Sequence, residues 1–123
     1  MIRFLIVCGA GAAGCGARYL VAIAVGPRPF PYATLIVNLI GSFLMALAME
    51  VSLRVASGVS PNLRLALTTG FMGGLTTYSS FNFETTTLAT QHAWLRVVLN
   101  VGATLIGCML AGLAGLWVAR RLT

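Results

Sequence analysis

The spacing of its long apolar stretches limits how this chain can fold more than any other feature does. Four stretches, at about residues 2–25, 32–56, 63–90 and 95–119, are each long enough to cross a bilayer core, which takes about 20 apolar residues. Hydrophobic residues make up 59% of the 123 residues and charged residues only 8%, whereas a soluble domain has about 25% charged residues. We therefore expect a single all-α domain, residues 1–123, that crosses the membrane four times and carries no soluble domain.

The distribution of charge predicts orientation more than it predicts a partner. The formal net charge is +6, which in a soluble protein would suggest nucleic acid. Here the arginines gather at the ends of the apolar stretches, where they contact headgroups and set topology, so we expect no nucleic-acid partner. Five arginines fall on one side of a four-span arrangement and two on the other. This bias modestly favours both termini inside and leaves insertion in both orientations open. The larger group is Arg3, Arg54, Arg64, Arg120 and Arg121; the smaller is Arg28 and Arg96.

Polar residues inside the first, second and fourth spans each allow two interpretations. Arg18 either snorkels to the headgroups or forms a positive vestibule that attracts anions. Asn38 either bonds one helix to another or lines a polar path. The same two options hold for the fourth span, where Asn100, Thr104 and Cys108 recur every four residues and form one polar stripe.

The third span contains GFMGGLTTYSSFNFE, in which five hydroxyl residues, 76–80, follow a glycine pair. Glycine and β-branched residues weaken a helix, so we expect a break in this stretch. A break at membrane depth frees backbone groups, which are tolerated only inside protein or against a water-filled cavity. Freed carbonyls can bind a cation, and the start of the next half-helix favours an anion. The alternative is that the hydroxyls bond only to carbonyls of their own helix.

The titratable residues favour an anion path over catalysis. The chain has one His and no Cys/His/Asp constellation, so we expect no enzyme. Its cysteines, Cys8, Cys15 and Cys108, predict neither a disulfide nor a metal site. Glu50 and Arg54 are four apart and are expected to pair on one helical face. The remaining polar groups inside the spans are mostly donors, which suit a small, strongly hydrated anion.

Three motifs, in this order, resemble the Fluc (CrcB-type) fluoride channel family over essentially the whole chain: GAGAAGCGARY, PYATLIVNLIGSF and GFMGGLTTYSSFNFE. The resemblance implies a dual-topology homodimer, whose two subunits lie antiparallel in the cell (inner) membrane and line two pores. It also implies passive fluoride efflux from the cytoplasm and a structural sodium ion at the centre. The dimer agrees with size, because four short helices leave no room for a sheltered aqueous path.

The resemblance also assigns residues. It implies that backbone carbonyls of Gly73 and Thr76 hold the sodium ion. For the anion pathway it implies the amide of Asn38, the ring edges of Tyr78 and Phe81, the hydroxyls of Ser79 and Ser80, Arg18 at the vestibule and the carboxylate of Glu84; we add Thr104 from the polar stripe. The sequence departs from the family at Tyr78, usually Phe, and at Cys108, where Ser is expected. Ala33 and Cys15 replace other small residues.

Two other functions fit a four-helix protein of this length. A small multidrug resistance transporter, which is proton-coupled, would need a membrane-embedded glutamate in the first span, and residues 2–25 contain no acidic residue. A non-transporting membrane scaffold would use the same polar groups only to hold helices together.

Overall fold

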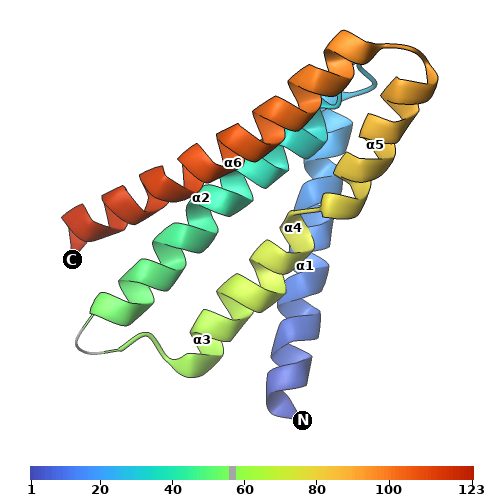
Figure 1. Cartoon of the computed structure of the whole chain (residues 1–123). Coiled ribbons are helices and arrows are strands. Elements are labelled where there is room, and N and C mark those ends of the chain that lie inside the picture. The colour runs from blue at the N-terminus through green and yellow to red at the C-terminus, as the bar shows by residue number, and fades with distance from the viewer. Residues whose placement is uncertain (56–57) are drawn as a thin grey trace.

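The computed structural model describes residues 1–55 and 58–123, and every regular element among them is a helix. Three helices are long and apolar enough to cross a membrane: α1 (Ile2–Val25), α2 (Tyr32–Arg54) and α6 (Trp94–Leu122) (Figure 1). The expectation of an all-α membrane protein is therefore confirmed. Residue 56, where the second apolar stretch was expected to end, lies outside the described residues.

The third span is not one helix but a series of short ones. It comprises α3 (Pro61–Leu65), the π-helical segment η1 (Ala66–Met72), the short α4 (Gly73–Leu75) and α5 (Tyr78–Thr90). Ser60 caps its start, because the Ser60 hydroxyl accepts a bond of 3.2 Å from the Leu63 N–H. Thr76 and Thr77 are extended and separate α4 from α5, which confirms the broken third helix. The glycine pair is itself helical, and the break begins one residue later, after Leu75.

Glycines let α1 cross η1 and α4 at backbone contact. A Cβ added at Gly14 would collide with the carbonyl oxygen of Phe71 and lie 2.9 Å from the Leu75 nitrogen. One added at Gly74 would collide with the carbonyl oxygen of Gly11. Small residues at such crossings allow close van der Waals packing between membrane helices. The small residues of the first span therefore serve helix packing, as expected for a membrane protein.

The helices divide into two packed groups. α6 lies along α2, while α1 packs against η1 and α4 (Figure 1). Between them lies a small buried core of Val37, Met72 and Leu75. Large apolar side chains such as Leu5, Leu95 and Met109 are exposed, as lipid-facing residues should be.

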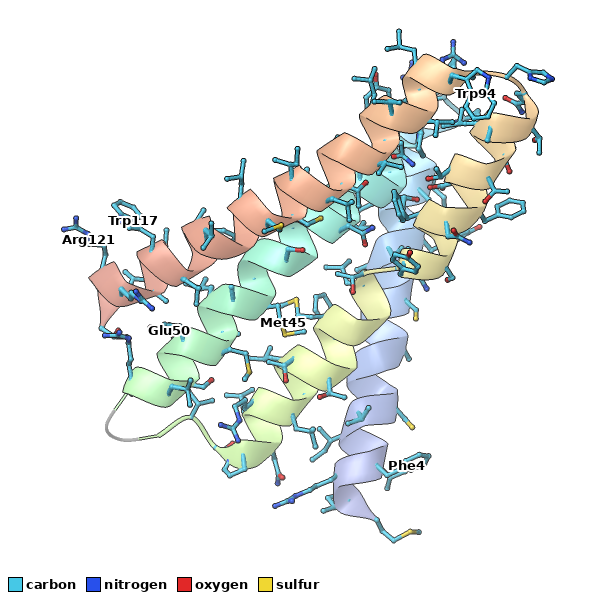
Figure 2. All side chains as sticks on the ribbon, in the orientation of Figure 1. Phe4, Met45, Glu50, Trp94, Trp117 and Arg121 are labelled. Carbon is cyan, nitrogen blue, oxygen red and sulfur yellow. The ribbon has the colours of Figure 1, made fainter. Side chains whose placement is uncertain are left out.

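One carboxylate joins the ends of α2 and α6. Glu50 Oε1 accepts bonds from Arg54 Nε at 2.7 Å and from Arg120 Nε at 3.0 Å. Nearby, the Arg121 guanidinium lies 5.1 Å from the ring centroid of Trp117 (Figure 2). The expected Glu50–Arg54 pair is confirmed, and Arg120 is a second partner. Glu50 thus forms ion pairs with two arginines at the end of the bundle.

Candidate functional site

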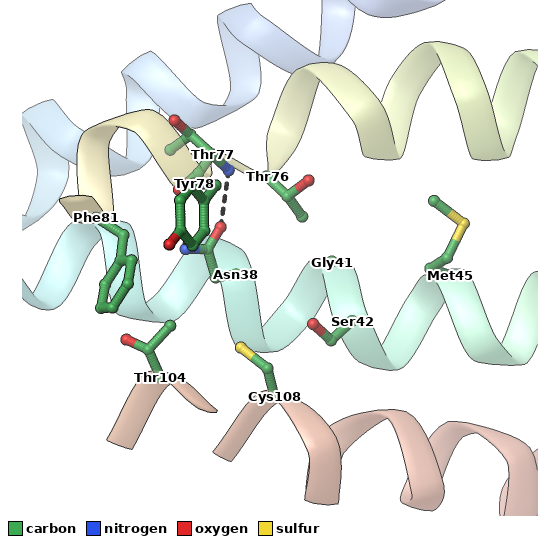
Figure 3. A pocket seen from close by; sticks show the side chains of 10 residues that line it. All are labelled: Asn38, Gly41, Ser42, Met45, Thr76, Thr77, Tyr78, Phe81, Thr104 and Cys108. Carbon is green, nitrogen blue, oxygen red and sulfur yellow. Dashed lines mark hydrogen bonds between the residues drawn. The ribbon is translucent and has the colours of Figure 1, made fainter. Parts of the chain in front are cut away.

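Asn38 holds the break in the third span. Its Oδ1 accepts a bond of 2.8 Å from the Thr77 N–H, and its Nδ2 donates to the Thr77 carbonyl at 3.2 Å (Figure 3). Buried backbone groups need partners, and in a membrane water does not supply them. The Asn38 side chain, which belongs to α2, therefore replaces the backbone hydrogen bonds that Thr77 would form in a continuous helix.

The break affects the carbonyls of residues 73–76, and for two of them the helical donor has a different partner. In a continuous helix the N–H of residue i+4 bonds to the carbonyl of residue i. The Thr77 N–H, which would serve Gly73, donates to Asn38, and the Ser80 N–H, which would serve Thr76, donates to Thr77 Oγ1 at 3.2 Å. The carbonyls of Gly73 and Thr76 are therefore available to another ligand. They are the two that the family resemblance assigns to sodium.

The five hydroxyls at the break have different partners. Thr76 bonds back to the Met72 carbonyl at 3.0 Å, as the purely structural alternative expects. Thr77 Oγ1 caps α5 and also contacts the hydroxyls of Ser79 at 3.2 Å and Ser80 at 3.1 Å. Back-bonding thus accounts for one hydroxyl of the five, and Thr77 is the centre of a hydroxyl cluster.

A cavity of about 310 Å³, here called the inner cavity, lies on one side of the break. α2, α5, α6 and the break itself form its wall (Figure 3). Its lining is Asn38, Gly41, Ser42, Met45, Thr76, Thr77, Tyr78, Phe81, Thr104 and Cys108. Four residues predicted for the anion pathway thus come together: Asn38, Tyr78, Phe81 and Thr104.

Two aromatic rings and a free hydroxyl distinguish the inner cavity. Phe81 is 6% exposed and Tyr78 74% exposed, with ring centroids 5.6 Å apart. Thr104 Oγ1 is buried without a hydrogen-bond partner among the described residues. Thr104 thus lines the inner cavity, although its Oγ1 is itself shielded from solvent.

The polar stripe of α6 has two roles. Asn100 is 2% exposed, and its Nδ2 donates to Thr85 Oγ1 at 2.8 Å, which holds α6 to α5. Thr104 and Cys108 face the inner cavity instead. Within this stripe, Asn100 therefore bonds one helix to another, whereas Thr104 and Cys108 line a cavity.

A second cavity of about 320 Å³, the Arg18 cavity, lies between α1, α2 and α5. Arg18, Ser80 and Glu84 line it, together with Thr77, which also lines the inner cavity. Thr34 Oγ1 donates to Glu84 Oε1 at 2.7 Å, while Glu84 Oε2 is buried with no partner among the described residues. Two of the predicted residues, Ser79 and Gly73, line neither of these two cavities.

Sequence reasoning missed Thr77 and Thr34 as site residues. Thr77 could have been found, because Thr is a favoured N-cap and stands directly before the second half-helix. Thr34 has no such local signal, since its partner Glu84 is 50 residues away.

Comparison with known proteins places the chain in a family. Residues 5–116 match the family model described as "CrcB-like protein, Camphor Resistance (CrcB)". A protein of Sorangium cellulosum (strain So ce56), named "Fluoride-specific ion channel FluC", is 49% identical over 91% of this chain and 90% of its own length. Proteins of the same name from Anaeromyxobacter sp. (strain K) and Geobacter sulfurreducens are 47% and 44% identical, each over 99% of this chain and over 98% and 100% of their own lengths.

Proposed function

Because this chain belongs to the CrcB-like protein family, we propose that it is a passive, fluoride-selective ion channel. The relatives are named as channels and not as enzymes, and the apolar helices make the chain a multi-pass membrane protein. We place it in the cell (inner) membrane, where it would export fluoride from the cytoplasm.

The lining of the inner cavity is the observation that carries the proposal, because Asn38, Thr104 and the rings of Phe81 and Tyr78 meet there. Fluoride is small and strongly hydrated, so a pore must replace its water with donors. Hydroxyl residues, Ser42 and Thr104, line the cavity together with the rings of Phe81 and Tyr78, whose edges carry partial positive charge. No cation lines this cavity, so the binding would be moderate, as conduction requires.

The break supplies the connection between the two cavities. Thr77 lines both, and its Oγ1 bonds to the hydroxyl of Ser80 on the Arg18 side. A fluoride ion would pass from Arg18 along these hydroxyls to Asn38 and Thr104. Hydroxyls rotate, so each can turn its proton toward the anion and then back to its neighbour.

An antiparallel homodimer would complete the pathway. The inner cavity has walls from α2, α5, α6 and the break but none from α1, and the Tyr78 hydroxyl beside it is exposed. A polar surface left against lipid is costly, whereas a second copy would cover it. Inverting that copy would bring both breaks to the middle of the bilayer, as inverted repeats do in transporters.

The residues at the break fit a structural sodium ion. The freed carbonyls of Gly73 and Thr76 are oxygen donors, and two antiparallel copies would supply four of them. When bound, sodium would supply a fixed positive charge that links the two subunits. We expect sodium to raise the thermal unfolding midpoint of the purified protein over that in N-methylglucamine, and an unchanged midpoint would count against the site.

The two alternatives have less support. A proton-coupled transporter of the small multidrug resistance type would need a carboxylate in the first span, and α1 contains none. A scaffold would leave no reason for an unpartnered buried hydroxyl in a cavity.

Fluoride efflux from liposomes that contain the purified protein tests the proposal. A fluoride electrode would follow release, with potassium and valinomycin clamping the voltage and chloride release as the comparison. We expect rapid fluoride release with little chloride release. Absence of release from verified dimeric protein would favour the scaffold.

A further inference from the structure

A third cavity lies where the α1–α2 loop meets the α5–α6 loop. Its volume is about 440 Å³, and we call it the outer cavity. It is lined by Arg28, Pro29, Pro31, Phe83, Glu84, Thr87, Leu88, Gln91 and Arg96. Two guanidinium groups thus line one cavity of mixed polar and apolar character at an end of the bundle.

Backbone bonds hold both guanidinium groups in place. Arg28 Nε donates to the Val25 carbonyl at 3.3 Å, and Arg96 Nη1 reaches the Pro29 carbonyl at 3.5 Å. Each guanidinium keeps further N–H donors, since Arg has five. Neither forms an ion pair within residues 1–55 and 58–123. The chain has only two acidic residues, and Glu50 is occupied by Arg54 and Arg120.

The outer cavity and the Arg18 cavity lie on either side of one side chain. Glu84 lines both cavities, and Thr34 holds its Oε1. Three guanidinium groups, those of Arg28, Arg96 and Arg18, line the two cavities against the single carboxyl group of Glu84, so positive charge is in excess. A narrow region of one sign with low-dielectric walls concentrates counter-ions.

We propose that Arg28 and Arg96 form an outer anion site that gathers fluoride at this mouth of the channel and delivers it past Glu84 to Arg18. This inference rests on the proposed function. Guanidinium groups attract any small anion, so the outer site sets the rate of arrival, while the inner cavity sets selectivity. In an antiparallel dimer one such site would lie at each membrane face.

The test is the ionic-strength dependence of fluoride efflux for the Arg28→Gln/Arg96→Gln double variant. Glutamine keeps an amide donor for the carbonyls and removes the charge. Efflux would be measured with voltage clamped by valinomycin, at about 0.01 M and about 1 M ionic strength on both sides, where the Debye length is about 30 Å and about 3 Å. Arg28→Lys/Arg96→Lys keeps the charge, and Arg121→Gln removes one at the other end of the chain.

We expect the glutamine variant to lose about three- to tenfold in rate at low ionic strength and less than about twofold at high ionic strength. The lysine variant and Arg121→Gln should match the wild type, and fluoride-over-chloride selectivity should not change. An equal loss at both ionic strengths, or no loss at low ionic strength, would overturn the outer site and leave the channel intact. Absence of wild-type flux would instead overturn the proposed function, and this inference with it.

Discussion

At the scale of single residues, two polar groups of the inner cavity differ in how they are bonded. Asn38 uses both ends of its amide on the backbone of Thr77. Thr104 has no partner for its hydroxyl among the described residues. Asn38 therefore stabilises the break beside the cavity, whereas the Thr104 hydroxyl forms no hydrogen bond within the described residues.

Replacing Thr104 by Val should lower flux without lowering stability. Valine has the same shape, and removing an unsatisfied buried hydroxyl is neutral or stabilising. Loss of one hydrogen bond to fluoride, about 1.4 kcal/mol, corresponds to about tenfold in efflux rate. Thermal unfolding and electrode efflux would be measured together, with Thr104→Ser as the variant that keeps the hydroxyl and the flux. A destabilised Val variant with normal efflux would assign Thr104 to packing.

Replacing Asn38 by Ala should lower both stability and flux. It leaves the buried N–H and carbonyl of Thr77 unpaired, at about 1–3 kcal/mol for each group. Chemical unfolding in detergent measures this, and Asn82→Ala, at an exposed position of α5, should change stability by less than about 0.5 kcal/mol. If Asn38→Ala kept wild-type stability, the inference that Asn38 stabilises the break would be wrong.

At the scale of elements, backbone contact between α1 and the segment η1–α4 positions the break. Gly14 faces the carbonyl of Phe71, and Gly74 faces that of Gly11. This contact holds the residues immediately before the break against α1, while Asn38 holds those immediately after it from α2. The break therefore lies between two fixed points.

Alanine at two glycines of α1 should have opposite effects. Gly14→Ala places a Cβ against backbone atoms of η1 and α4, so the helices must separate, and overpacking of this kind costs about 1–3 kcal/mol. Gly16 has no atom within 4 Å of an added Cβ, so Gly16→Ala should be neutral or stabilise by about 0.5–1 kcal/mol. Unfolding midpoints of the two variants test this, and equal midpoints would refute the close crossing.

At the scale of the whole molecule, the inner cavity is lined by α2, α5, α6 and the break. No residue of α1 lines it, and Tyr78 at its edge is largely exposed. The arginines at the far ends of α2 and α6 are tied to Glu50, which holds those two helices together independently of a partner. The proposed second copy would thus complete the proposed pathway, whereas the contact between α2 and α6 lies within one chain.

The antiparallel arrangement predicts a specific labelling result. A protease added outside sealed liposomes should remove an N-terminal tag from one chain of each dimer, whichever way the dimer inserts. After solubilisation, capture of the remaining tags should recover cleaved and intact chains in about equal amounts. A parallel dimer would yield only intact chains in the captured fraction, which would exclude the inverted arrangement.

The sequence by itself determined the features that depend on local spacing. The length of each apolar stretch predicts a membrane span because the bilayer thickness sets how long a spanning helix must be. The pairing of Glu50 with Arg54 and the cap at Ser60 were predictable because both join residues within one helical turn.

Only the tertiary structure decided where the third span breaks and which polar groups are left free. Gly74 packs against α1 within the helical segment, and the Thr77 N–H outside it is satisfied by Asn38, 39 residues earlier. Asn100 and Thr104 lie on one stripe of α6. The Asn100 amide donates to Thr85, whereas the Thr104 hydroxyl has no partner among the described residues. Buried polar groups take whichever partner the packing of other helices brings near, and no local pattern records that choice.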